Sequence, residues 1–214
     1  MKLSAITAQN LLQHVSVLSE QYPDRHTGDP QEREAVAYIA EQMRQAGLAV
    51  TIMEVPVMGW ELHFGPELEI LEPESRTVEC APFIFSGSTP RSGLEGYLQP
   101  IGKSLVAGGF EWDKYALVDE NGAWQALIVG RDEGPAIAQA GPPSGLAGTA
   151  ETPLITWPSC VLGSTDLDTI KAWESAGQQV KVRYRAGAHF KPDARSFIVK
   201  GVLTGHTDSD DILI

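Results

Sequence analysis

Cysteine, positive charge and long apolar runs are all scarce in this 214-residue chain. No segment approaches the roughly 20 consecutive apolar residues that a membrane-spanning helix needs, so we expect no membrane insertion. Only 16 residues are Lys or Arg against 28 Asp or Glu, which gives a formal net charge of -12 without any basic cluster. Nucleic acids and anionic membranes attract positive surfaces, and the composition therefore argues against both as partners.

The chain has only two cysteines, Cys80 and Cys160, and they form no CxxC pair. Two free and mostly buried thiols are the favoured interpretation, and a single disulfide is the alternative. The N-terminal segment is interrupted by Gln9 and Asn10 and lacks the continuous apolar stretch of a secretory signal. Together these features predict a cytoplasmic protein.

The remaining composition is that of a globular protein, with 43% hydrophobic residues and a length that suits one large domain or two small ones. Residues 30–46 predict a helix, because Asp29 is a favoured N-cap and Pro30 suits the first helical position. Glu32 stands where a capping box has its acid, and Gly47 is expected to end the helix. The β-branched residues of 48–57 then predict a strand.

A region of predicted short strands begins near Trp60, where short apolar runs alternate with turn residues. Residues 163–177 predict a helix with Thr165 and Asp168 as its capping-box pair. After it, Val180, Val182 and Tyr184 alternate with three cations, which predicts a strand with one buried and one wet face. A separate strand is expected over residues 196–203, beyond the polar stretch 186–195.

The stretch from Tyr22 to Val50 resembles the opening of the zinc-dependent aminopeptidase family that also contains glutamate carboxypeptidase and transferrin receptor. The positions that match the family's Arg-x-x-Gly turn, helix and strand entry are Arg25, Gly28, Glu32, Arg33, Ala35, Tyr38, Ile39, Gly47 and Leu48. Two later runs, residues 122–130 and 152–185, look like a protease-associated domain, the β-rich module that many members insert after the first strand.

This resemblance implies an α/β fold in which a partial αβα peptidase domain is interrupted by a β-rich protease-associated domain. The implied segments are residues 1–59 for the N-terminal helices and first strand, 60–187 for the inserted domain, and 188–214 for the return strands. A full-length member would be a hydrolase with two zinc ions that acts on peptide substrates. So short a piece of its sheet would have an open edge, through which self-association is expected.

The tail contains His206-Thr207-Asp208, which looks like the His-x-Asp metal motif of the family. In one register residues 205–211 form a turn and the metal motif would follow Ile214; in the other, His206 and Asp208 are themselves zinc ligands. The first is favoured, because it explains residues 212–214 as a strand start and keeps Lys200 out of a strand buried on both faces. In either register a co-catalytic zinc site needs more ligands and a general base, and the six residues after Asp208 include no Glu or His.

No catalytic, cofactor-binding or metal-binding residue is therefore assigned within the chain, and no cofactor is expected to bind it alone. The other histidines are expected at the surface or in packing: His14, His26, His63 and His189. Most of the five tryptophans are expected in the core, with a peptide groove as the alternative: Trp60, Trp112, Trp124, Trp157 and Trp173.

Two functions stay open. The chain is either the N-terminal part of an aminopeptidase-like zinc metallopeptidase, with scaffold and substrate-gating domain but no competence alone, or a non-enzymatic protease-associated module that binds peptides or proteins.

Overall fold

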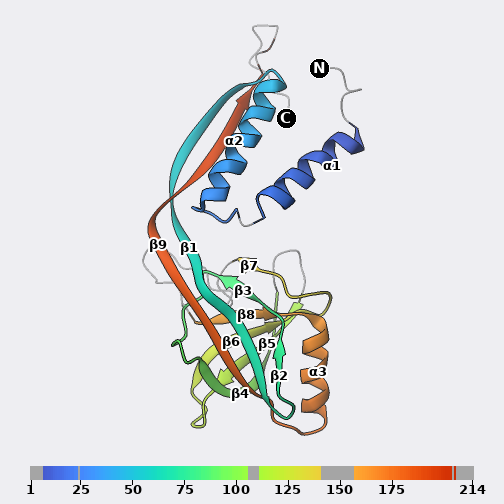
Figure 1. Ribbon diagram of the computed structural model, residues 1–214. Helices are drawn as coiled ribbons and strands as arrows, with labels where there is room; N and C mark the ends of the chain where they lie inside the picture. Colours follow the sequence, from blue (N-terminus) through green and yellow to red (C-terminus); the bar gives the residue numbers. More distant parts are fainter. Residues whose placement is uncertain (1–6, 24, 106–110, 141–156, 204, 206–214) are drawn as a thin grey trace. The chain divides into compact units, whose positions relative to one another are not determined.

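The computed structural model describes residues 7–23, 25–105, 111–140, 157–203 and 205. The chain forms two compact units, unit 1 made of Met1–Gly59 with Lys191–Ile214, and unit 2 made of Trp60–Phe190 (Figure 1). The helices are α1 (Ala8–Ser16), which continues into the π-helical turn η2 (Val17–Gln21), α2 (Pro30–Gln45) and α3 (Ser164–Ser175). The strands are β1 (Ala49–Glu72), β2 (Arg76–Val78), β3 (Cys80–Ile84), β4 (Leu94–Leu105), β5 (Glu111–Val118), β6 (Trp124–Gly130), β7 (Gln139–Ala140), β8 (Ser159–Leu162) and β9 (Lys181–Val202). Within the described ranges, none of the helices has the length and apolarity to cross a membrane.

Both ends of α2 follow from local sequence. The Asp29 side chain accepts a hydrogen bond of 2.9 Å from the backbone N of Gln31, so the predicted N-cap is confirmed. At the other end Gly47 has φ +87°, and its N donates to the carbonyl of Arg44 while the N of Leu48 donates to that of Met43. This is a Schellman ending, which glycine permits because it has no Cβ, and it directs the chain into β1.

Glu32 has a different role from the one a capping box predicts. The backbone N of Asp29 already donates to the carbonyl of His26, so the Glu32 carboxylate accepts from the N of Gly28 at 2.7 Å instead. Its second oxygen accepts from the Ser196 hydroxyl on β9. Glu32 therefore joins the start of α2 to a strand that lies more than a hundred residues later in the chain.

Helix α2 packs against the parts of β1 and β9 that belong to unit 1. Ala35, Val36 and Ala40 are buried along its inner side, and the Arg33 guanidinium lies 5.0 Å from the centre of the Phe197 ring on β9. Near the end of β9 a Cβ on Gly201 would stand 2.8 Å from Leu48 and 3.4 Å from Met43. The absence of a side chain at Gly201 therefore lets the helix end and the strand meet.

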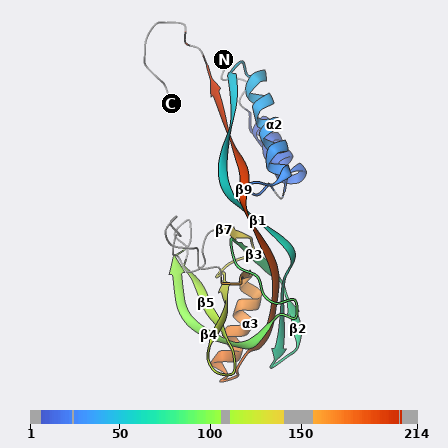
Figure 2. The same ribbon diagram turned by 90° about the vertical axis from the view of Figure 1, so that its left-hand side faces the viewer.

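Strands β1 and β9 are far longer than the sequence predicts. Strand β1 continues for 24 residues through the expected boundary at Trp60, and β9 runs for 22 residues through the polar stretch that we expected to separate two strands. Figures 1 and 2 show the two strands side by side and oppositely directed, and they are hydrogen-bonded neighbours in the sheet. Each strand supplies backbone partners to the other, so extended structure persists where side-chain signals are weak.

The chain is mixed α/β, and its sheet is open and mostly antiparallel. The strand order is β2-β1-β9-β4-β5-β6-β8-β3-β7. Among the pairs with a defined register, only β6 with β8 and β3 with the short β7 are parallel. In unit 2 the core contains Val180, Val182 and Tyr184, each at most 1% exposed, so the predicted alternation of β9 is confirmed.

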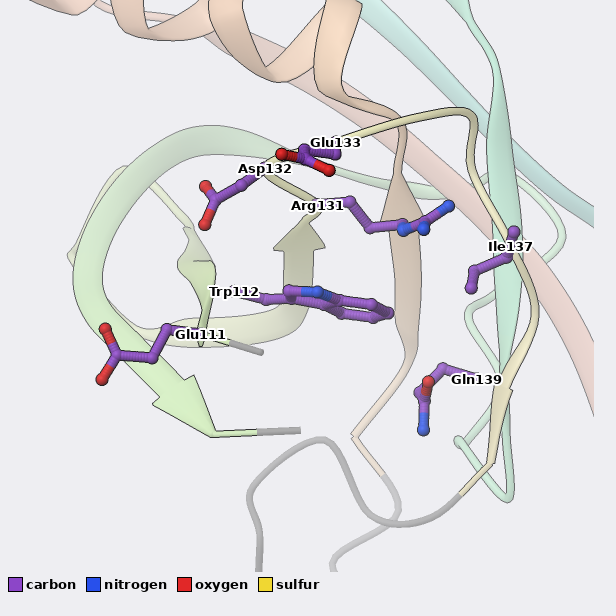
Figure 3. A pocket seen from close by; sticks show the side chains of 7 residues that line it. All are labelled: Glu111, Trp112, Arg131, Asp132, Glu133, Ile137 and Gln139. Atoms are coloured by element: carbon purple, nitrogen blue, oxygen red, sulfur yellow. The ribbon is translucent and has the colours of Figure 1, made fainter. Parts of the chain in front are cut away.

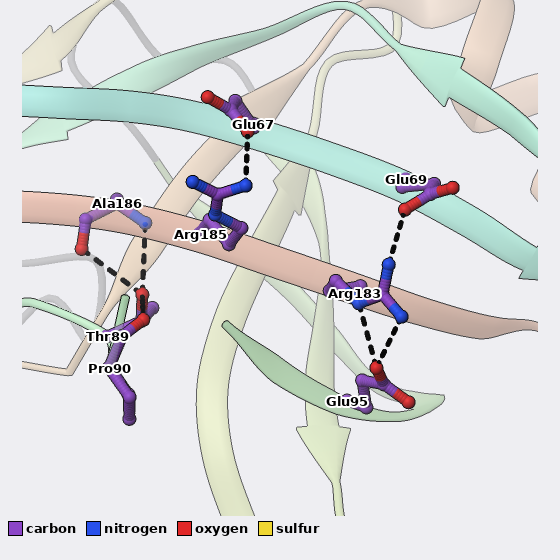
Figure 4. Close-up of polar contacts among 8 residues, drawn as sticks. All are labelled: Glu67, Glu69, Thr89, Pro90, Glu95, Arg183, Arg185 and Ala186. Atoms are coloured by element: carbon purple, nitrogen blue, oxygen red, sulfur yellow. Dashed lines mark hydrogen bonds and ion pairs between the residues drawn. The ribbon is translucent and has the colours of Figure 1, made fainter. Parts of the chain in front are cut away.

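The opposite face of β9 is exposed to solvent and carries several ion pairs (Figure 4). Arg183 contacts Glu69 of β1 at 2.9 Å and Glu95 of β4 at 2.6 Å, and Arg185 contacts Glu67 at 3.3 Å. These pairs are half-exposed, so each contributes little to stability by itself. The pairs join β9 to β1 on one side and to β4 on the other.

Helix α3 begins earlier than its sequence predicts. Its N-cap is Gly163, and Thr165 lies inside the helix, so the capping-box pair of Thr165 and Asp168 is wrong. The start is held by a tertiary contact, in which the backbone N of Ser164 donates to the carbonyl of Gly134 at 2.9 Å. The buried stripe is nevertheless the expected one: Leu167 and Ile170 are fully buried and Trp173 packs against the core.

Candidate functional site

A hollow of about 420 Å³ opens on unit 2, where β5 begins and β6 ends (Figure 3). We call it the Trp112 hollow; its lining residues are Glu111, Trp112, Arg131, Asp132, Glu133, Ile137 and Gln139. The first two open β5, and the others lie on the segment that leaves β6 and reaches β7. A space of this size accommodates a small ligand or one or two peptide side chains.

Trp112 and Arg131 form the rigid centre of the hollow. The indole of Trp112 is 6% exposed, and the Arg131 guanidinium lies over it, 5.5 Å from the ring centre. The guanidinium also donates to the carbonyl of Pro135, which closes the loop that follows β6. Stacking and hydrogen bonding together hold the cation in place, so it is a wall of the hollow and not a free arm.

Four charged side chains, with Asp132 of the hollow among them, form a cluster of ion pairs. Lys171 of α3 contacts Asp113 at 2.6 Å and Asp132 at 3.7 Å, and Lys103 of β4 contacts the same two aspartates at 3.8 and 3.5 Å. Burial acts to lower the pKa of Lys171, but the hydrogen bond and charge of Asp113, with Asp132 and Asp168, raise it overall. Lys171 is therefore kept cationic, which makes it an anchor for the loop and a poor nucleophile.

Tyr115 and Glu174 form a pair near this cluster in which the pKa of each group is raised. The Tyr115 hydroxyl donates to the Glu174 carboxylate at 3.2 Å. Burial, followed by the charge of Glu174, raises the pKa of Tyr115 far above its usual value. Burial also raises the pKa of Glu174, although the hydrogen bond from Tyr115 opposes it. Both groups connect α3 to β5, and neither faces the hollow.

Within the part of the chain that the structure describes, no three His, Cys, Asp or Glu side chains come together as a metal site. The described residues therefore do not fit a two-zinc centre. His206 and Asp208, the two candidate ligands in the tail, lie outside the described residues.

Three of the other four histidines make local side-chain contacts. His14 shares a hydrogen bond of 2.7 Å with the Tyr38 hydroxyl, which joins α1 to α2, and the rings of His63 and His189 lie 5.6 Å apart. Of the tryptophans, Trp60 and Trp112 are buried and Trp173 packs on the core, as expected, while Trp124 is 51% exposed. Trp112 both packs in the core and lines the hollow. The sequence offered both roles for the tryptophans but did not single out Trp112 for the second.

No protein-family model matches the chain, and no curated protein matches it. Several solved structures match the chain. A peptidase M28 precursor from Shewanella amazonensis SB2B matches with a TM-score of 0.61 at 14% identity, over 87% of this chain and 48% of its own. The aminopeptidase from Aneurinibacillus sp. strain AM-1 gives 0.52 at 19% identity, over 91% and 47%.

A zinc aminopeptidase from Bacillus subtilis gives a TM-score of 0.55 at 17% identity, over 91% of this chain and 46% of its own. At such identities the likeness concerns the fold: the chain resembles part of the M28 peptidases. It spans about half the length of the solved structures that it matches.

Proposed function

We propose that this chain is the N-terminal part of an M28-type zinc aminopeptidase, in which unit 1 is scaffold and unit 2 is a protease-associated domain that controls access of peptides. The observation that carries the proposal is the fold likeness to three such peptidases over most of this chain but only about half of theirs. The zinc ligands and the general base would then come from sequence beyond the described residues. No step of hydrolysis is assigned to the side chains described above.

The surface of unit 1 supports this proposal. Most of the exposed large apolar side chains of the described residues belong to it: Leu11, Leu12, Val15, Ile52, Met53, Met58, Ile198, Val202 and Leu203. The exposed fraction reaches 65% for Leu12 on α1 and 69% for Leu203 after β9. Apolar groups in this number on one small unit are typical of a surface that further structure covers. In the proposed protein that cover is the remainder of the peptidase domain.

The Trp112 hollow supports the role given to unit 2. Its apolar surface comes from Trp112 and Ile137, and the carboxylates of Glu111 and Glu133 lie beside them. An extended peptide could place an apolar side chain on the indole and keep its backbone near polar groups. Such contacts, away from any catalytic group, would select which peptides reach a neighbouring active site.

The intact gene product tests the proposal against the 214-residue chain. We expect the intact product to be longer, to contain zinc by elemental analysis, and to hydrolyse leucine p-nitroanilide in a chelator-sensitive way. The 214-residue chain alone should show neither zinc nor activity. An intact product that ends at Ile214 and is folded, free of zinc and inactive would overturn the peptidase proposal.

The same hollow favours a second candidate, a peptide-binding module without any enzyme. In that case the 214-residue chain alone should bind peptides from a random library, and Ile137→Glu should weaken binding at least tenfold. Trp124→Ala, which removes an exposed indole outside the hollow, is the matched control and should bind like the unaltered chain. Binding by the isolated chain together with a naturally short gene product would favour the module over the peptidase.

A further inference from the structure

The two cysteines, far apart in the sequence, face each other on neighbouring strands. In the antiparallel register of β3 and β8, Cys80 pairs with Leu162 and Cys160 pairs with Pro82. The cysteines are thus a diagonal pair, displaced by two residues and on the same face of the sheet. Both thiols are free, and the neighbouring Cys80 thiol helps to raise the pKa of Cys160, in keeping with two side chains that lie close together. The Cα atoms of diagonal partners lie about 7–8 Å apart, so a disulfide between them needs a small movement of the two strands.

The two thiols differ in access. Cys160 is fully buried in the core of unit 2, whereas Cys80 is partly exposed and packs against the edge of the same core. Burial, together with the neighbouring Cys80 thiol, raises the pKa of the Cys160 thiol. An oxidant from solvent therefore reaches Cys80 first, and Cys160 is the protected neutral partner behind it.

The pair is not a metal site. No third His, Cys, Asp or Glu completes a ligand group around the two sulfur atoms within the described ranges. A structural zinc needs four such ligands. Two neighbouring thiols, one partly exposed and one buried, are instead the arrangement of an oxidisable thiol with its resolving partner.

We propose that Cys80 and Cys160 are a redox-sensitive thiol pair, which a peroxide closes to a disulfide that links β3 to β8. The Cys80 thiolate attacks one peroxide oxygen, the O–O bond breaks, and the departing oxygen leaves as water with the thiol proton. The sulfur of Cys160 then attacks the sulfur of the resulting Cys80 sulfenic acid and the S–O bond breaks. The departing hydroxide takes the Cys160 proton and leaves as a second water. Each sulfur is oxidised by one electron, and the peroxide is reduced to two waters.

The test uses hydrogen peroxide on the folded 214-residue chain, with free thiols counted after quenching and denaturation. We expect both thiols to disappear together, a proteolytic peptide pair cross-linked through Cys80 and Cys160 in the monomer, and full recovery with dithiothreitol. In Cys160→Ser, Cys80 should accumulate as sulfenic acid that dimedone labels. In Cys80→Ser, Cys160 should resist peroxide in the folded chain and react only in urea.

The unaltered chain decides the proposal even where a variant fails to fold. Dimedone labelling of Cys80 without a cross-link would overturn it, because the buried thiol would then be unable to resolve the sulfenic acid. A cross-link that forms only in urea, or only between two chains, would overturn it equally. Protection of both thiols in the folded chain would show that Cys80 is out of reach of the oxidant, and the proposal would fail on that result too.

Discussion

The contact between α3 and β6 gives the sharpest prediction for unit 2. Leu167 is fully buried in the core, and it lies over Gly130, the last residue of β6. A Cβ added at Gly130 would stand 2.4 Å from Cδ1 of Leu167, 2.9 Å from Cδ2 and 3.0 Å from Cγ. All three of these atoms are absent from alanine. The two positions therefore compete for one volume, and substitutions at both must couple.

The magnitudes follow from this geometry. Leu167→Ala should lower the free energy of unfolding by about 2–5 kcal/mol, through lost burial and a residual cavity. Gly130→Ala should cost about 1–3 kcal/mol, because the new methyl group overpacks against the fully buried Leu167 side chain. In the double variant the methyl group occupies the space that Leu167 leaves, so the cost should be less than the sum by about 1 kcal/mol or more.

Urea unfolding followed by tryptophan fluorescence measures these quantities for unit 2 specifically. All five tryptophans lie between residues 60 and 190, which are the limits of that unit. Ser175→Ala, at an exposed position in the last turn of α3, is the control and should change stability by less than about 0.5 kcal/mol. Additivity of the two core substitutions within about 0.5 kcal/mol would refute the close packing of Leu167 on Gly130.

Three further predictions concern other contacts. Because burial raises the pKa of Glu174, the folded chain holds this proton more tightly than the unfolded chain does. The free energy of unfolding should therefore fall as pH rises through the unfolded and then the folded pKa of Glu174. Glu174→Gln should flatten this slope in urea unfolding between about pH 4 and 7, and an unchanged slope would contradict the prediction. Glu32→Ala leaves the N of Gly28 and the Ser196 hydroxyl without their acceptor. Amide exchange of residues 196–202 should therefore quicken, in keeping with a loss of about 1–3 kcal/mol, while the fluorescence midpoint of unit 2 stays unchanged. The reverse pattern would contradict the role of Glu32 as a contact within unit 1. His206→Ala should leave the zinc content of the 214-residue chain at background, and stoichiometric zinc that this substitution abolishes would instead make His206 a ligand.

Some features of this protein were set by residues close together in the sequence. Asp29 as N-cap, Gly47 as the helix end and the alternation of Val180, Val182 and Tyr184 all agree with the structure. Each depends on backbone groups within a few residues or on the period of a single element. Such features are decided by local geometry and hydrogen bonding, which the sequence specifies directly.

Other features were decided by tertiary structure. The unbroken length of β1 and β9 comes from their pairing with each other, and the start of α3 comes from the carbonyl of Gly134. The Trp112 hollow and the diagonal pair of Cys80 and Cys160 join residues from separate strands and loops. No local pattern encodes these features, because they form only when distant segments of the chain pair and pack together. The sequence by itself determined helix ends, one strand alternation and a family resemblance. The packing of distant segments decided the length of β1 and β9, the start of α3, the Trp112 hollow and the placement of the two thiols on neighbouring strands.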